Sequence, residues 1–273
     1  MKIGVTSLGM RGLPLPEAID QMKQFGAECT ELNGRPGCHP DLTWESEADE
    51  ERARVLFASA GIAVTSLGGY CDFAQADDRA MEAQIEGFVG YCQQAARVGI
   101  PVVRAFAGDV KEGYVLADLQ KRIVAAFVEL MKRVTGLGIQ IGIENHGRLA
   151  NDGFFLRELI ETVASPRLGM TIDTGNFYWA GHSPEQVETF IRLLAPYALN
   201  VHVKDVVYRD GQVAFVPAGR GIVDLPGLYA LLESNRYAGV LVSEYEGKGP
   251  YEQGTLESVA YLRGLRDGRE RGL

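Results

Sequence analysis

Cysteine is scarce in this 273-residue chain, which contains only four. All four lie within the first 92 residues, and they form no CxxC pair and no Cys/His spacing of the zinc-finger kind. Such isolated thiols are typical of a reducing compartment rather than of a disulfide-bonded secreted protein. The opening MKIGVTSLG also lacks the pattern of a signal peptide. We therefore expect a cytoplasmic protein.

Long apolar runs and basic clusters are missing as well. No stretch reaches the roughly 18 consecutive apolar residues that a membrane span requires. The formal net charge of -9 repels a phosphate backbone, and no group of Lys and Arg residues offsets that repulsion locally. We therefore expect neither a membrane nor a nucleic acid as a partner.

Short apolar runs typical of strands alternate with amphipathic stretches typical of helices along the whole chain. Between the runs, apolar residues recur at helical spacing, as in Leu119, Ile123, Phe127 and Leu130. The alternation predicts eight strands, at residues 3–7, 29–32, 63–67, 102–106, 140–144, 169–173, 200–203 and 240–243.

Helix ends can be predicted from capping residues. Ser183 before Pro184, and Asp224 before a Leu-Pro pair, each place an N-cap next to an early proline. Glycine separates a helical stretch from the next strand, as a C-cap does, at Gly26, Gly61, Gly99 and Gly138.

Eight such units without a break in composition favour an α/β fold of the closed (β/α)8 TIM barrel type, with residues 1–273 forming one domain. A hydrophobic content of 46% is enough for one large core. An open doubly wound sheet is the alternative. It usually carries GxGxxG after the first strand, whereas this chain has LGMRG.

Four acid or imidazole side chains end strands in the second half of the chain. Glu144, Asp173, His202 and Glu244 stand at or just past the last apolar position of IQIGIE, LGMTID, NVHV and GVLVSE. In a TIM barrel the carboxyl ends of the strands surround one mouth, so these side chains should converge. Three carboxylates and one imidazole suit a single divalent ion, with Mn²⁺ or Mg²⁺ favoured and Co²⁺ or Zn²⁺ as alternatives.

The runs IGIENHG, LGMTIDTGNF, NVHVKDV and VSEYEG, together with GRGIVDLPGL, resemble those of the xylose isomerase-like TIM barrels. That superfamily of sugar phosphate isomerases and epimerases also includes ketose 3-epimerases, inosose and dehydroshikimate dehydratases, and apurinic endonucleases. The resemblance covers nearly the whole chain. It implies that Glu144, Asp173, His202 and Glu244 are metal ligands and that the two glutamates are also the catalytic acid/base groups.

Three departures from the family pattern bear on the substrate. Many epimerases have a histidine three positions after the aspartate of strand six, where this chain has Asn176. The arginine common six positions after the histidine of strand seven is replaced by Tyr208. The extra histidines with which apurinic endonucleases build a three-zinc cluster are missing at residues 68–70 and 107–109.

Further polar residues are expected near the mouth. The candidates for substrate binding are His146, Asn176, Lys204, Arg104, Arg220 and Phe106. The alternatives are loop packing for the histidine, solvation for the lysine, an inward ion pair for Arg104, plain exposure for Arg220 and core packing for the phenylalanine. Glu31, at the end of an early strand, is expected either to bind substrate or to be exposed, as for Arg220. His39 and His182 are expected at the surface.

These residues predict a sugar isomerase or epimerase. A metal that holds a carbonyl oxygen and the adjacent hydroxyl stabilises an enediolate while a glutamate moves the proton. We expect a small polyhydroxylated carbonyl substrate, uncharged rather than phosphorylated because no Gly-rich phosphate cradle is present. An inosose- or 3-dehydroshikimate-type dehydratase is the alternative, an apurinic endonuclease or a plain sugar-binding barrel is less favoured, and a homodimer is compatible with the sequence.

Overall fold

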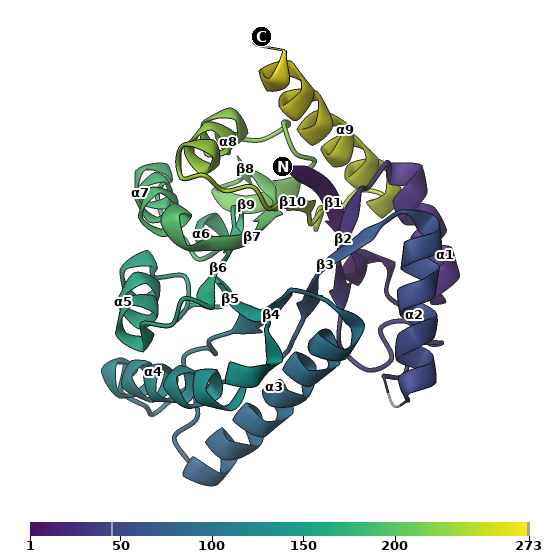
Figure 1. Ribbon diagram of the computed structural model, residues 1–273. Helices are drawn as coiled ribbons and strands as arrows, with labels where there is room; N and C mark the ends of the chain where they lie inside the picture. Colours follow the sequence, from purple (N-terminus) through teal and green to yellow (C-terminus); the bar gives the residue numbers. More distant parts are fainter. Residues whose placement is uncertain (45, 272–273) are drawn as a thin grey trace.

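A closed barrel of parallel strands forms the centre of the computed structural model, which describes residues 1–44 and 46–271 (Figure 1). The strand order around the barrel is β1-β10-β7-β6-β5-β4-β3-β2. These strands are β1 (Lys2–Thr6), β2 (Cys29–Asn33), β3 (Ala63–Gly68), β4 (Val102–Phe106), β5 (Gln140–Glu144), β6 (Leu168–Asp173), β7 (Ala198–Val203) and β10 (Val240–Ser243). The predicted TIM barrel and all its predicted strands are confirmed.

Helices form a ring outside the barrel (Figure 1). They are α1 (Leu15–Phe25), α2 (Glu47–Ala60), α3 (Asp78–Val98), α4 (Leu116–Arg133), α5 (Gly153–Val163), α6 (Asn176–Trp179), α7 (Pro184–Leu194), α8 (Leu225–Ser234) and α9 (Tyr251–Glu270). Short 3-10 turns occupy Ser7–Met10, Thr135–Leu137 and Ala195–Tyr197. In α4, Leu119, Ile123, Phe127 and Leu130 are all buried, so the apolar stripe faces the strands. Among the described residues, no helix has both the length and the apolar character needed to cross a membrane.

The predicted helix ends are confirmed by the backbone geometry. The Ser183 side chain accepts the N–H of Gln186, and the two residues form a reciprocal capping box. The Asp224 carboxylate accepts the N–H of Gly227 at 2.9 Å. Left-handed backbone follows the helical segments at the predicted glycines, with φ of +74° at Gly26, +71° at Gly61, +75° at Gly99 and +71° at Gly138.

An antiparallel hairpin between β7 and α8 departs from the predicted pattern. It consists of β8 (Asp205–Arg209) and β9 (Gln212–Val216). Its turn is Asp210-Gly211, with φ of +50° and +75°, which is the dipeptide preference of a two-residue hairpin turn. Because the hairpin begins directly after β7, it lies at the carboxyl-terminal mouth of the barrel.

Candidate metal centre and active site

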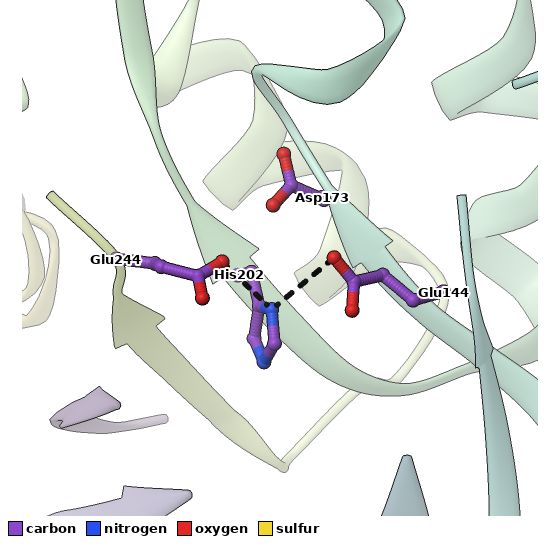
Figure 2. A group of neighbouring side chains, drawn as sticks. All are labelled: Glu144, Asp173, His202 and Glu244. Atoms are coloured by element: carbon purple, nitrogen blue, oxygen red, sulfur yellow. Dashed lines mark ion pairs between the residues drawn. The ribbon is translucent and has the colours of Figure 1, made fainter. Parts of the chain in front are cut away.

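Four side chains meet at the carboxyl ends of β5, β6, β7 and β10, which are neighbours in the barrel (Figure 2). They are Glu144, Asp173, His202 and Glu244; all are buried, and one potential ligand atom from each lies within 4.8 Å of the others. The Nδ1 atom of His202 lies 3.2 Å from Glu244 Oε2 and 3.8 Å from Glu144 Oε1. The structure therefore brings the predicted ligands together at one point.

Unsatisfied buried atoms in this cluster fit a cation. Asp173 Oδ2, His202 Nδ1 and Glu244 Oε2 are buried and accept or donate no hydrogen bond. They have ion-pair contacts with one another or with Lys204, but a buried polar atom without a hydrogen bond costs roughly 1 to 3 kcal/mol. Since these atoms belong to three members of one cluster, a single divalent ion would satisfy all of them, and oxygen-rich sets with one imidazole suit such ions.

Backbone and amide groups fix the orientation of Asp173. Its Oδ1 accepts the N–H groups of Gly175 and Asn176, both at 2.8 Å. Its own N–H donates to Asn145 Oδ1 at 2.7 Å, and Asn145 Nδ2 donates to the Asp173 carbonyl at 2.9 Å. One carboxylate oxygen is thus held by the protein, which leaves Oδ2 for the cluster.

Lys204 is buried beside the cluster rather than solvated. Its Nζ lies 3.2 Å from Asp173 Oδ2, 3.1 Å from Glu244 Oε2 and 2.8 Å from Glu246 Oε2. Burial lowers the pKa of Lys204, but these carboxylates outweigh it and raise the pKa well above its ordinary value. The ammonium therefore stays charged and offsets part of the negative charge of the site.

Burial and neighbouring charges set the titration of the three carboxylates among the predicted ligands. Burial alone would raise the pKa of Glu144, but Arg104 and His202 hold it below its usual value. Burial opposes ionisation of Glu244 too, yet Lys204 and His202 keep its pKa well below the ordinary range. Burial raises the pKa of Asp173 to about 7 in spite of Lys204. The two glutamates are therefore ionised at neutral pH, whereas Asp173 is only partly ionised there.

A cavity of about 530 Å³ opens at this cluster. It is lined by Leu8, Arg35, Tyr70, Cys71, Asp72, Gln84, Arg104, Phe106, Glu144, His146, Lys204, Glu244 and Glu246. The rings of Phe106 and His146 contact each other with their centroids 4.3 Å apart and their planes tilted by 33°. The volume lies in the range of small-molecule pockets, so the cavity is large enough for a small polar substrate.

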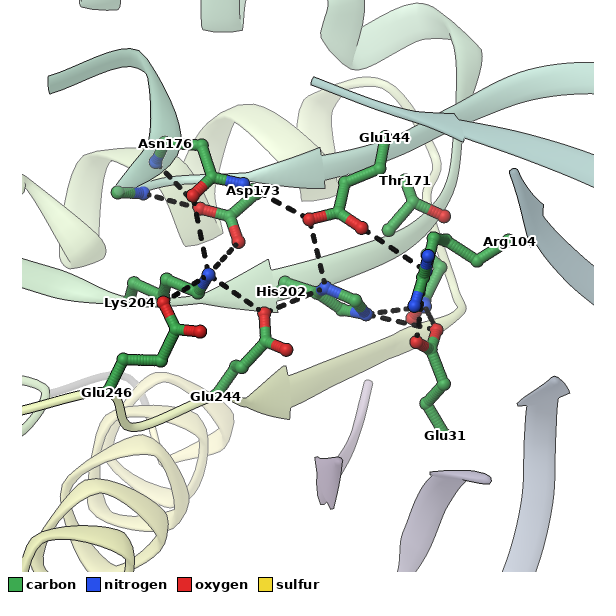
Figure 3. Close-up of polar contacts among 12 residues, drawn as sticks. Glu31, Arg104, Glu144, Thr171, Asp173, Asn176, His202, Lys204, Glu244 and Glu246 are labelled. Atoms are coloured by element: carbon green, nitrogen blue, oxygen red, sulfur yellow. Dashed lines mark hydrogen bonds and ion pairs between the residues drawn. The ribbon is translucent and has the colours of Figure 1, made fainter. Parts of the chain in front are cut away.

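Asn176 and Arg104 contact Glu144 from two sides (Figure 3). Asn176 Nδ2 donates to Glu144 Oε1 at 3.1 Å, while its Oδ1 accepts from Lys204 at 3.3 Å. Arg104 Nε lies 3.2 Å from Glu144 Oε2 and 3.4 Å from Glu31 Oε1. Arg104 therefore forms the inward ion pair and also lines the cavity, and its contact with substrate stays a prediction.

The structure does not bring Arg220 into this cavity. Asp205 accepts the N–H groups of Gly219 and Gly221, both at 2.9 Å, and thereby fixes the loop on either side of Arg220. The arginine side chain is 70% exposed and lies 3.4 Å from Glu257 on α9. Its predicted contact with substrate therefore has no counterpart in the geometry.

Two early residues differ from the sequence interpretation. The expectation that His39 lies at the surface is wrong, since its side chain is buried against Leu13 O and Ser7 Oγ at 3.0 and 3.1 Å. Glu31 is also buried, and its Oε2 lies 3.0 Å from His202 Nε2. The signal that could have located Glu31 is its place at the end of a barrel strand.

A parallel eight-stranded barrel with a buried carboxylate and imidazole cluster at its mouth defines a class of TIM-barrel proteins. Residues 19–265 match the family model described as "Xylose isomerase-like TIM barrel", and the chain belongs to this family. Over 198 residues it is 25% identical to a Homo sapiens protein named "Putative hydroxypyruvate isomerase". That alignment covers 67% of this chain and 66% of the human protein, slightly less than two thirds of its length.

Solved structures share the fold along the full chain. A structure described as a D-tagatose 3-epimerase-like protein is 18% identical, with a TM-score of 0.82 and complete coverage of both chains. A structure described as the IOLI protein with a binding zinc atom is 17% identical, with a TM-score of 0.79 and coverage of 97% of this chain and 96% of the other. At this level of identity the likeness concerns the fold alone.

Metal soaking tests the predicted donor set. We expect crystals soaked with Mn²⁺ to show one ion bound by Glu144, Asp173, His202 and Glu244, with ligand bonds of about 2.0 to 2.3 Å. Anomalous scattering identifies the ion, and a chelator-treated crystal is the control. Donor atoms that stay more than about 2.5 Å from a common centre would contradict the assignment.

Proposed function

We propose that this protein is a divalent-metal-dependent isomerase or epimerase that acts on a small polyhydroxylated carbonyl compound. One observation carries the proposal: Glu144 and Glu244 lie on opposite sides of His202 within one buried cluster (Figure 2). Both have lowered pKa values, so both are ionised at neutral pH and have a free lone pair that a proton can occupy. Inversion of a carbon beside a carbonyl uses two such groups, one on each face.

When bound, the cation would supply Lewis-acid polarisation of the substrate oxygens. The proton transfer belongs to the two glutamates. One removes the proton from the carbon beside the carbonyl, and the opposite one, after it has taken up a proton from solvent, delivers that proton to the other face, which inverts the centre. If the first glutamate instead returns the proton to the neighbouring carbon, the carbonyl moves and the reaction is an isomerisation.

Other cavity residues have roles that follow from their contacts. Lys204 is charged and lies beside the cluster, where it would stabilise negative charge that develops on a substrate oxygen. Asn176 holds Glu144 by a hydrogen bond of 3.1 Å, so it would orient that carboxylate. Phe106 and His146 line the cavity together and would contact the substrate.

The comparisons support the isomerase class and leave several metals open. The human relative carries an isomerase name, and a solved relative is described as epimerase-like. We propose Mn²⁺ or Mg²⁺ as the ion, with Co²⁺ or Zn²⁺ as alternatives, because three of the donors are carboxylates. Structures of relatives are described with zinc and with magnesium.

All four cysteines are free and buried, which supports the proposed cytoplasmic location.

Exchange with solvent deuterium tests this function. We expect the metal-loaded protein to incorporate deuterium beside the carbonyl of a ketose, inosose or short hydroxy-carbonyl compound without loss of water, and to do so only with the metal present. Mass spectrometry and NMR of the recovered compounds provide the measurement. Loss of water from the substrate would identify a dehydratase instead, and no exchange across this panel would refute the proposal.

A further inference from the structure

Glu31 is a buried carboxylate on β2, a strand that contributes none of the predicted metal ligands. Its side chain is 4% exposed. The Oε2 atom accepts hydrogen bonds from Ser66 Oγ and Asn200 Nδ2, both at 2.9 Å, and lies 3.0 Å from His202 Nε2. Burying a carboxylate costs several kcal/mol unless it is paired. The contacts of Glu31 with Ser66, Asn200 and His202 therefore offset that cost and indicate the groups on which it acts.

The two nitrogens of the His202 ring face opposite groups (Figure 3). Nδ1 points to Glu244 and Glu144 and has no hydrogen-bond partner, whereas Nε2 points to Glu31. An ionised carboxylate can only accept, so the Nε2 atom must carry a proton in that contact. A neutral imidazole protonated on Nε2 has its lone pair on Nδ1, the atom that faces the cluster.

Asn200 offers Nε2 a competing contact. Its Nδ2 lies 3.3 Å from His202 Nε2, but it lies closer to Glu31 Oε2, at 2.9 Å, and 3.2 Å from Ser66 Oγ. The amide therefore has two acceptors without the ring nitrogen. The contact between His202 Nε2 and Glu31 Oε2, at 3.0 Å, is shorter than the contact between His202 Nε2 and Asn200, at 3.3 Å. The ring nitrogen Nε2 therefore donates to Glu31 and carries the proton.

We propose that Glu31 is a positioning residue that acts through His202. It fixes the orientation and the tautomer of the ring, so that Nδ1 is presented to the metal while Nε2 is held by a carboxylate. Such a partner also makes the imidazole a stronger ligand. This inference rests on the metal site of the proposed function, but it does not depend on which reaction that site performs.

Arg104 extends the effect of Glu31 to a second ligand. Its Nε lies between Glu31 Oε1 at 3.4 Å and Glu144 Oε2 at 3.2 Å. The guanidinium also donates to Gly69 O at 3.0 Å and lies 4.1 Å from the centre of the Phe106 ring. Glu31 therefore contacts His202 directly and is connected to Glu144 through Arg104, so one buried network links Glu31 to two predicted ligands.

The test measures metal binding in Glu31→Gln, which keeps the length of the side chain and removes its charge. We expect the affinity for Zn²⁺ and Mn²⁺ to fall by about 10- to 100-fold, the usual range for the loss of such a partner. Glu31→Asp keeps the charge but shortens the side chain, so we expect a loss there too. The matched control is Glu50→Gln. Glu50 is a buried carboxylate outside the cavity that pairs with Arg97 at 2.6 Å, so the metal affinity of this variant should equal that of the wild type.

A second readout follows the ring itself. The chain has four histidines, so nitrogen-15 spectra of the Zn²⁺-loaded protein resolve each ring. In the wild type we expect metal on His202 Nδ1 and a hydrogen-bonded proton on Nε2, and in Glu31→Gln we expect that proton to shift or exchange faster with solvent. A folded Glu31→Gln variant with wild-type metal affinity and an unchanged Nε2 proton would overturn the inference. So would a wild-type protein in which the metal is bound by His202 Nε2 instead of Nδ1.

These outcomes separate the inference from the proposed function. A wild-type protein that binds metal through Nδ1 but exchanges no substrate proton would refute the reaction and leave the role of Glu31 intact. Normal turnover together with unchanged metal binding in Glu31→Gln would refute the role of Glu31 alone. A wild-type protein that takes up no divalent ion would overturn both.

Discussion

Glu144→Gln and Glu244→Gln are each expected to lower turnover by at least about a hundredfold, because each change removes a proton carrier and a ligand charge at the same time. Glutamine has the shape of glutamate, so the barrel should be preserved. The measurement is the rate of metal-dependent deuterium exchange on the best substrate of the panel, at a metal occupancy determined for every variant.

Glu246→Gln is the comparison for these two variants. Glu246 lines the same cavity and contacts Lys204 at 2.8 Å, but it does not belong to the four-residue cluster. We expect its replacement to cost much less than that of either cluster glutamate. Wild-type exchange in the double variant Glu144→Gln/Glu244→Gln at full metal occupancy would contradict the two-glutamate mechanism.

The parts of the site that were predicted from sequence are those that local pattern determines. Glu144 and Asp173 are the last residues of their strands and His202 is the last but one of β7, and the (β/α)8 topology places all such ends at one mouth. Their convergence therefore required only the strands and their order. The helix caps at Ser183 and Asp224 were predictable for the same reason, because a cap is a contact between residues about three positions apart.

Contacts between distant residues were not predictable in this way. Glu31 and His202 are 171 residues apart in the chain; their places near strand ends bring both to the barrel mouth, but do not indicate which side chains touch there. The outward position of Arg220 follows from backbone hydrogen bonds to Asp205, which a loop sequence does not show. The hairpin after β7 had a local signal in Asp210-Gly211, but its two strands interrupt the expected alternation of strand and helix.

Asp173 is the member of the cluster whose charge is least compatible with the metal-free fold. Burial raises its pKa from 3.8 to about 7, so the folded protein holds a proton there more tightly than the unfolded chain does. As pH rises from about 4 to about 7, that preference is lost, and the free energy of unfolding falls by up to about 4 kcal/mol. Metal-free protein above pH 7 therefore carries the full destabilisation.

Asp173→Asn should consequently make the metal-free protein more stable and the site unable to hold metal. The amide oxygen can still accept the N–H groups of Gly175 and Asn176, while the buried negative charge is gone. We expect Tm without metal to rise by at least about 3 °C at pH 8 and to change little at pH 5, where Asp173 of the wild type is already protonated in the fold.

Added Mn²⁺ should reverse that order, because only the wild type retains the ligand. We expect the metal affinity of Asp173→Asn to be at least about a hundredfold lower, beyond the usual cost of losing a residue that merely supports a ligand. Wild type should then gain in Tm with metal concentration while the variant does not. Calorimetry at pH 5 and pH 8, with and without Mn²⁺, provides the measurement. A metal-free variant less stable than wild type at pH 8, or one that binds Mn²⁺ as tightly, would show that Asp173 serves the fold rather than the ion.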